Sequence, residues 1–455
     1  MATSRVAIMC IGTRGDVQPY LALAVALRDS GADVLLLSLS SHEELVQSAG
    51  IRFVSVGLGF DAAQDSTPEG RAMKAAQGPF ASRRALQAYM QAQGALYWRA
   101  ADEALLDFKP DVAVVGTIAA YVFTSLLDLR KVPFLLAHCA PFVPSRHGAP
   151  PVFNCTTWRS GCNPIGMMLN RMTWSLAMRA DWHLVYQPVV NALRCNHKMA
   201  PITHGAGVYG HYGGRLRPVL LMQSPLLAPR LLDYPSEVLV SGRPEVPLKE
   251  YAPPADVAAF LHAGQQPVCI TLGSMAVFLD RPKFSRRGAT SILALAVDSV
   301  TDAGARCLVF TEGAPEAACD ALRQRPDVLL VSRGLPHSFL FPRCAAIICH
   351  GGAGTVHAAL AAGSPCVVVA VETFWDQLWW GHKLVAARLA PAAFAAQKVT
   401  RRQLRAAVAT CLHDTGLRAR CAAAAAATDP TAAASAAVTF VMGVADKGWQ
   451  DIPPL

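Results

Sequence analysis

Short apolar runs alternate with helix-like stretches in two separate series along this chain, and this alternation constrains the fold most. The first series contains RVAIMCIG, DVLLLSLS and PDVAVVGT, and the second contains PVCITLGS, CAAIICHGG and PCVVVAV. Such runs are typical of strands buried on both faces, and strands separated by helices pair in parallel. The sequence therefore predicts an α/β fold with two Rossmann-like, doubly wound parallel sheets.

A proline-rich stretch separates the two series and marks a domain boundary. It contains SGRPEVPLKEYAPPADV, a composition that is typical of connections between domains. We therefore expect an N-terminal domain over residues 1–233, a linker over 234–266 and a C-terminal domain over 267–455. Two such domains would face each other across a cleft at the carboxyl ends of their strands, where ligands bind in sheets of this kind.

Charge, cysteine content and hydropathy limit the kinds of partner and compartment that are expected for this chain. The net charge is +9, but Lys and Arg are scattered and form no stripe interleaved with aromatic residues, so nucleic acid is not an expected partner. The 13 cysteines are an odd number and include no CxxC pair, which favours reduced thiols in a cytoplasmic protein over a disulfide frame or a zinc site. No apolar run approaches the about 20 residues of a membrane-spanning helix.

The stretch HGGAGTVHAALAAG, from His350 to Gly363, follows a predicted strand and opens a predicted helix. Glycines allow close backbone approach, and the free N–H groups at a helix N-terminus bind anions. The segment is neither a Walker A sequence nor a full GxGxxG motif. Taken alone, it indicates either a phosphate site or a structural turn.

Polar residues at neighbouring strand ends favour the ligand interpretation. Ser274 follows one strand of the same domain, and Asp376 and Gln377 follow another. An adjacent carboxylate and amide suit sugar hydroxyls, because one accepts hydrogen bonds and the other also donates them. The alternatives are a helix N-cap for Asp376 and core packing for the three nearby tryptophans, Trp375, Trp379 and Trp380.

The first strand is followed by IGTRGDVQPY, which contains Asp16. Asp16 is expected either to cap a helix that begins at Val17 or to act on a ligand. Because Pro19 has no N–H group, a cap at Asp16 would lack part of its usual hydrogen bonding. Arg14 either approaches the same ligand or is an exposed loop charge.

These motifs resemble those of the family 1 glycosyltransferases of GT-B fold, most closely the sterol and lipid glucosyltransferase branch, which shares features with antibiotic-tailoring enzymes. The resemblance rests on GTRGDVQPYLALAVAL, LGSM, LPHSFLFPRCAAIICHGGAGT and WDQLWWG, in this order. It covers both ends of the chain and is loose between about residues 141 and 230, where the acceptor is chosen. It implies two Rossmann-like domains, the second of which binds a UDP-sugar, usually UDP-glucose.

The resemblance also implies roles for single residues. Asp16 would be the general base of an inverting transfer, a role that contributes about 10²–10⁴-fold in rate. The glycine loop and helix dipole would meet the charge on the departing diphosphate, so neither a metal ion nor another cofactor is expected. The implied donor-binding residues are Thr13, Arg14, Ser274, His337, His350, Gly352, Ala353, Gly354, Thr355, Asp376 and Gln377.

Two features depart from the family pattern or work against the implied chemistry. His357 replaces a small residue, and we expect it at the surface without a role; Ser338 and Phe339 also differ from the usual residues after the Pro-His pair. Arg14 and the helix N-terminus both favour an ionised Asp16, which would be a weak base while water is present.

The acceptor region, Trp158 to Tyr186, is rich in Trp, Met and Arg. Met and Trp supply adaptable apolar surface that suits a lipophilic acceptor such as a sterol. Arg159, Arg171 and Arg179 are placed to contact anionic headgroups, which predicts peripheral contact with a membrane surface; the alternative is an ordinary helix packed on the core. Besides sterol glucosylation, tailoring of a secondary metabolite and a catalytically silent sensor of UDP-sugar or lipid remain open.

Overall fold

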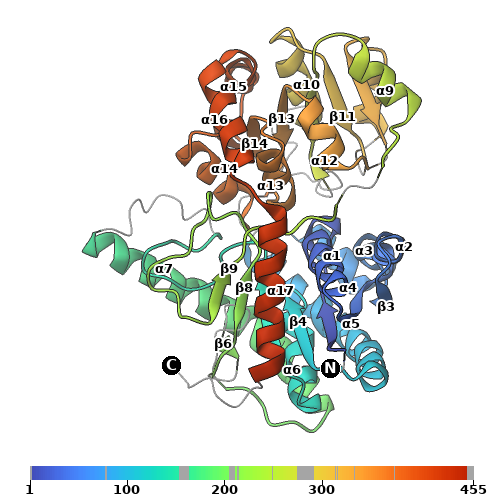
Figure 1. The fold of residues 1–455 in the computed structure, drawn as a ribbon, viewed down its shortest axis with the longest axis vertical. Coiled ribbons are helices and arrows are strands. Elements are labelled where there is room, and N and C mark those ends of the chain that lie inside the picture. The colour runs from blue at the N-terminus through green and yellow to red at the C-terminus, as the bar shows by residue number, and fades with distance from the viewer. Residues whose placement is uncertain are drawn as a thin grey trace.

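The structure, a computed structural model, describes residues 3–76, 79–152, 163–203, 211–212, 215–247, 250–273, 292–312, 314, 316–332, 334–372 and 375–447. Its strands form two parallel sheets, one in each of two lobes (Figure 1). The sequence predicted this α/β class, and the two parallel sheets confirm it. No helix among the described residues combines the length and apolar character needed to cross a bilayer.

The N-terminal lobe is built on a seven-stranded sheet of order β3-β2-β1-β4-β5-β8-β9. Its strands are β1 (Arg5–Met9), β2 (Asp33–Leu39), β3 (Arg52–Gly57), β4 (Val112–Gly116), β5 (Phe134–His138), β8 (Val219–Leu221) and β9 (Val238–Val240). The helices of this lobe are α1 (Arg14–Asp29), α2 (Glu43–Ser48), α3 (Phe60–Ser66), α4 (Pro68–Ala75), α5 (Pro79–Phe108), α6 (Ala120–Arg130), α7 (Pro164–Asp181) and α8 (Gln187–Asn196). A short antiparallel ribbon joins β6 (His211–Tyr212) and β7 (Arg215–Leu216).

The C-terminal lobe carries a six-stranded sheet of order β12-β11-β10-β13-β14-β15. Its strands are β10 (Val268–Thr271), β11 (Cys307–Phe310), β12 (Val328–Val331), β13 (Ala346–Cys349), β14 (Cys366–Ala370) and β15 (Ala393–Ala395). Its helices are α9 (Ala255–His262), α10 (Ile292–Thr301), α11 (Glu316–Arg323), α12 (His337–Leu340), α13 (Ala353–Ala361), α14 (Gln377–Ala386), α15 (Arg401–His413) and α16 (Thr415–Ala426).

The strand orders identify where ligands bind. In the first sheet the order reverses between β1 and β4, and in the second it reverses between β10 and β13. Loops that leave strands at such a reversal diverge to opposite faces of the sheet and leave a crevice at the strand ends. The loop after β1 and the loop after β13, the two segments that the sequence singled out, lie at these two points.

The lobe boundaries differ from the expected domains in two places. The expected linker, residues 234–266, contains β9, which extends the first sheet, and α9. The last helix, α17 (Pro430–Lys447), returns to the N-terminal lobe, where Ala437 and Val441 join the hydrophobic cluster of β1 and α1 (Figure 1). Its alanines allow this close packing, and the C-terminal segment therefore stabilises both lobes.

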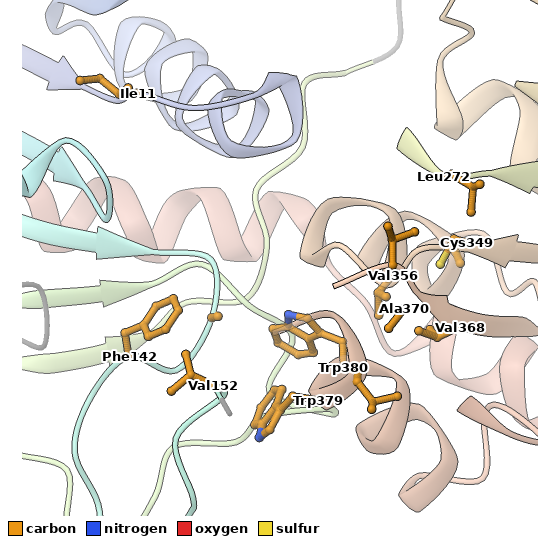
Figure 2. Close-up of a cluster of buried hydrophobic side chains, with 14 of the residues drawn as sticks. Ile11, Phe142, Val152, Leu272, Cys349, Val356, Val368, Ala370, Trp379 and Trp380 are labelled. Carbon is orange, nitrogen blue, oxygen red and sulfur yellow. The ribbon is translucent and has the colours of Figure 1, made fainter. Parts of the chain in front are cut away.

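One hydrophobic cluster extends through both lobes. Figure 2 shows Trp379 and Trp380 of α14 between the second sheet and the N-terminal residues Phe142 and Val152. Core packing, the alternative considered for the three tryptophans, holds for these two, whereas Trp375 is 42% exposed. The buried pair fixes α14, and with it Asp376, relative to the N-terminal lobe.

Candidate active site

The loop after β1 holds Asp16 by a capping box rather than by the expected N-cap. Thr13 is the N-cap of α1, and Asp16 is the third helical residue. The backbone N–H and the hydroxyl of Thr13 both donate to Asp16 Oδ2, at 2.8 and 2.9 Å. The prediction that the helix begins at Val17 was wrong, because the Thr-x-x-Asp pattern caps it three residues earlier.

Two small backbone features shape this loop. Gly12 has a φ of +143°, and a Cβ there would lie 2.5 Å from Asp16 Oδ2, so only glycine fits. Pro19 has no N–H group, and the Gly15 carbonyl therefore lacks its usual partner within the helix. That carbonyl oxygen lies 3.7 Å from the position of a Cβ on Gly354 in the opposite lobe. The loop and α13 thus meet across the cleft.

The cleft changes the electrostatics of Asp16. Asp16 keeps contact with solvent, but the many protein atoms around its carboxylate partly desolvate it, and this desolvation raises its pKa. The hydrogen bonds from Thr13 and the charge of His42 act in the opposite direction. The effect of burial counters the weak basicity that the sequence suggested. His42 was not singled out from the sequence; it is buried after β2, and its Nε2 lies 3.0 Å from the Gly12 carbonyl oxygen.

The loop after β13 leads into α13, which begins at Ala353. Gly351 has a φ of +91°, and Gly352 is the N-cap of α13 with no side-chain cap. A Cβ on Gly352 would lie 2.4 Å from Nε2 of His350. The N–H groups of Ala353, Gly354 and Thr355 therefore begin the helix without an internal partner, which is the arrangement that binds an anion.

His350 lies directly behind these amides. It is buried, and burial lowers its pKa to about 4, so the ring is neutral near pH 7. Its Nδ1 has no hydrogen-bond partner among the described residues. A neutral imidazole can offer one hydrogen bond to a ligand without adding charge to the site.

Asp376 and Gln377 lie at the start of α14, close to the cleft. Burial raises the pKa of Asp376 to about 6; the hydrogen bond from Trp380 Nε1, at 2.9 Å, opposes this, and the charge of Asp16 adds to it. The two carboxylates therefore interact across the cleft. Gln377 is buried, and its Oε1 accepts a hydrogen bond from the Glu372 amide at 3.0 Å.

Basic groups from three parts of the chain converge beside the helix amides. His337 stacks on Phe341 with centroids 4.3 Å apart. Burial lowers the pKa of His337 to about 4, and the charges of Arg14, His350 and Arg243 act in the same direction. Arg14 reaches across the cleft, with Nη1 2.9 Å from the position of a Cβ on Gly334. Of these groups, Arg243 was not predicted; it lies in the expected linker.

His357 is not the surface residue that the sequence suggested. It is 3% exposed, and its ring packs edge-on against Trp380 with centroids 4.8 Å apart. The Ser224 amide donates to Nε2 at 2.9 Å, so Nδ1 carries the proton and donates to the Ala353 carbonyl at 2.7 Å. The imidazole thus joins the N-terminal lobe to the first turn of α13. Ser274, expected opposite the diphosphate, lies outside the described residues.

Family models match both halves of the chain. Residues 6–125 match the glycosyltransferase family 28 N-terminal domain, and residues 297–439 match the erythromycin biosynthesis protein CIII-like C-terminal domain. The first match contains the Asp16 loop, and the second contains the glycine segment and the start of α14. Both candidate halves of the site thus lie within matched domains, and the N-terminal match is a glycosyltransferase domain.

Similar sequences include sterol glucosyltransferases and an antibiotic-tailoring enzyme. Sterol 3-beta-glucosyltransferase UGT80A2 of Arabidopsis thaliana is 28% identical over 85% of this chain and 57% of its own length. O-mycaminosyltylonolide 6-deoxyallosyltransferase of Streptomyces fradiae is 28% identical over 91% of this chain and 92% of its own length. The chain thus spans less than two thirds of the two Arabidopsis relatives, 57% and 60%.

Solved glycosyltransferases share the fold. CalG4, the calicheamicin glycosyltransferase, superimposes with a TM-score of 0.66 at 17% identity, over 98% of this chain and 99% of its own. VinC in complex with dTDP superimposes with a TM-score of 0.62 at 17% identity, over 98% of this chain and 100% of its own. By its fold and by both matched domains, the chain belongs to the glycosyltransferases of GT-B type.

Proposed function

We propose that this protein transfers a sugar, glucose in the first instance, from a UDP-sugar to the hydroxyl of a sterol or another lipophilic acceptor, with inversion at the anomeric carbon. One observation carries the proposal: the loop that holds Asp16 and the uncapped start of α13 meet across the cleft, at the switch points of two parallel sheets. A base and an anion site so placed can act on the two sides of one anomeric carbon.

The geometry of Asp16 suits a general base. Oδ2 accepts both hydrogen bonds from Thr13, whereas Oδ1 has no hydrogen bond from the described residues. Oδ1 takes the proton of the acceptor hydroxyl as that oxygen bonds to the anomeric carbon. The bond from this carbon to the diphosphate oxygen breaks, and its electron pair remains on the departing UDP.

The anion site stabilises the negative charge that develops on the leaving group. The amides of Gly354 and Thr355 and the positive end of the α13 dipole face the place that we assign to the diphosphate. Donors fixed in position before the reaction stabilise the transition state without rearrangement. Asp376, with Gln377, would hold the sugar hydroxyls, and the segment at His337 would lie by the uracil base. The proposed reaction uses no metal ion.

Two alternatives have specific support. The Streptomyces relative, over 92% of its length, favours tailoring of a secondary metabolite. Three of the solved neighbours are described as complexes with thymidine diphosphate, which raises TDP-sugars as donors. A catalytically silent protein that binds UDP-sugar or lipid would keep the α13 amides but would not need the free oxygen of Asp16.

The test pairs donors with acceptors. Purified protein is incubated with UDP-glucose or TDP-glucose and a panel of sterols and macrolide aglycones, and products are identified by mass spectrometry. We expect a sterol glucoside from UDP-glucose, with loss of turnover in Asp16→Asn and retention of UDP binding. Turnover only with macrolides would favour tailoring, and UDP binding without any turnover would favour the silent protein.

We also propose that α7 touches an anionic membrane surface from which the acceptor is drawn. Its outward face carries four exposed aliphatic side chains at helical spacing, and Arg171 and Arg179 lie beside them. Its one acid, Asp181, is buried and accepts a hydrogen bond from the Tyr121 hydroxyl at 2.8 Å. The exposed side chains are Ile165 (68%), Met168 (54%), Met172 (60%) and Leu176 (69%).

Vesicle co-sedimentation tests this surface. We expect binding to vesicles with anionic lipid, weaker binding in high salt, and loss of binding in the variant Met168→Glu/Met172→Glu. Leu96→Glu is the matched control, because Leu96 is a 59% exposed residue of α5. Equal binding of both variants, or binding to neutral vesicles alone, would contradict the proposal.

A further inference from the structure

Arg243 follows β9, and its guanidinium is positioned at the start of α13. Its Nη2 lies 3.4 Å from the position that a Cβ on Gly354 would occupy, and the Gly15 carbonyl oxygen lies 3.7 Å from the same point. Gly242 precedes it with a φ of +87°, and a Cβ there would lie 2.9 Å from Cβ of Ala433 in α17. This tight turn against α17 directs Arg243 into the gap between the lobes.

Within the part of the chain that the structure describes, Arg243 forms no ion pair, and its Nη1 is buried without a hydrogen-bond partner. Arg14, His337 and the N-terminal end of α13, which lie near it, are positive or neutral. Its charge also acts on one acid, Glu245. A cation beside the positive end of a helix is unfavourable by itself. An anion bound between the two would remove this cost.

From this placement we propose that Arg243 donates hydrogen bonds to the diphosphate of the bound nucleotide-sugar, opposite the amides of α13. This inference rests on the proposed function and adds a donor-binding residue from the connection between the lobes. As the bond between the anomeric carbon and the diphosphate oxygen breaks, the electron pair stays on that oxygen. The positive charge of the Arg243 guanidinium stabilises that oxygen.

Because Arg243 comes from the connecting segment, the contact has a second consequence. The diphosphate would touch the C-terminal lobe through α13 and the connecting segment through Arg243. Donor binding would then fix the segment that sets the separation of the lobes. Asp16 would be brought to the anomeric carbon by the same contact that holds the leaving group.

The competing role is structural. Arg243 and Glu245 both border a cavity of about 340 Å³, which is also lined by Ser224, His357 and Asp429. Burial raises the pKa of Glu245, and the charge of Arg243 opposes this. A purely structural Arg243 would serve to compensate Glu245. In that case the variants Arg243→Gln and Glu245→Gln would affect the same property, the stability of the fold.

Calorimetric titration with UDP and with uridine separates the two roles. We expect Arg243→Gln to bind UDP about 10- to 100-fold more weakly than wild type, the usual range for a hydrogen bond to a charged group. Uridine has no phosphate, and its affinity should not change. Thermal unfolding without ligand should be unchanged or shifted upward, because an unpaired buried charge has been removed. Glu245→Gln should bind UDP like wild type.

The other possible outcomes of these titrations reject either the contact of Arg243 with the diphosphate or the proposed donor site. Unchanged UDP affinity in Arg243→Gln, or an equal loss for UDP and uridine, rejects the contact with the diphosphate and leaves the proposed function standing. A lower unfolding temperature in Arg243→Gln and in Glu245→Gln, with UDP affinity intact, establishes the structural role. If wild type binds neither UDP nor TDP, the proposed donor site and this inference both fail.

Discussion

Replacing Asp16 by Asn separates the chemistry of this carboxylate from its structural role. The amide keeps the size of the side chain, and its oxygen can still accept from the N–H and hydroxyl of Thr13. The base is lost. We expect kcat to fall by about 10²–10⁴-fold, which corresponds to about 3–5 kcal/mol in the activation free energy. Loss of the charge at the helix N-terminus should cost only about 0.3–1 kcal/mol of stability.

The chain provides a matched control for the capping contribution. Helix α15 begins with a second capping box, in which Thr400 donates to Gln403 Oε1 at 2.8 Å, far from the cleft. Thr400→Ala should lower the free energy of unfolding by about 1 kcal/mol and leave kcat unchanged. Loss of a cap is thereby distinguished from loss of the base.

The assay measures initial rates with saturating donor. UDP affinity is measured in parallel by calorimetry, and stability by unfolding in urea. Asp16→Asn should bind UDP at least as tightly as wild type, because a negative charge near the diphosphate has been removed. An Asp16→Asn variant whose kcat stays within about tenfold of wild type would refute the assignment of the base. A loss of rate that follows the loss of stability in both variants would do the same.

Three further predictions concern the donor side of the cleft. Gly352→Ala places a Cβ 2.4 Å from Nε2 of His350, so the loop must shift, and UDP affinity should drop by about tenfold or more. Unchanged affinity in a calorimetric titration would contradict the anion site. Burial raises the pKa of Asp376 to about 6. The donor KM should therefore rise as the pH falls below about 6, because the protonated carboxyl accepts hydrogen bonds from sugar hydroxyls less well. A flat pH profile of the donor KM, or a pH dependence that persists in Asp376→Asn, would reject this prediction. His357→Ala removes the acceptor of the Ser224 amide and should lower the free energy of unfolding in urea by about 1–3 kcal/mol. An unchanged midpoint of urea unfolding would show that the contact of His357 with Ser224 contributes no stability.

Local patterns explain what the sequence could predict. Buried strands and the helices between them have distinctive periods, so the two parallel sheets were evident, as was the placement of His350 and Asp376 at strand ends. The start of α1 was misplaced although its signal was present. The pattern Thr13-Arg14-Gly15-Asp16 is a capping box with an acid at its fourth position, and this pattern would have placed the helix start correctly.

Other features depend on contacts between distant segments and leave no local trace. Arg243 follows a strand of three residues between prolines, which resembles a linker until the first sheet is assembled around it. His357 is polar on the face of a short helix, and only the docking of the Ser224 amide makes its burial favourable. His42 enters the site because β2 ends beside β1. These positions follow from the assembled fold and not from the pattern of the segment that carries them.

A structure of the complex with UDP tests the central claim most directly. We predict that diphosphate oxygens lie within about 2.7–3.2 Å of the backbone nitrogens of Gly354 and Thr355, with Asp16 facing the open side of the terminal phosphate. A diphosphate bound elsewhere, or amides of α13 that point away from it, would contradict the account.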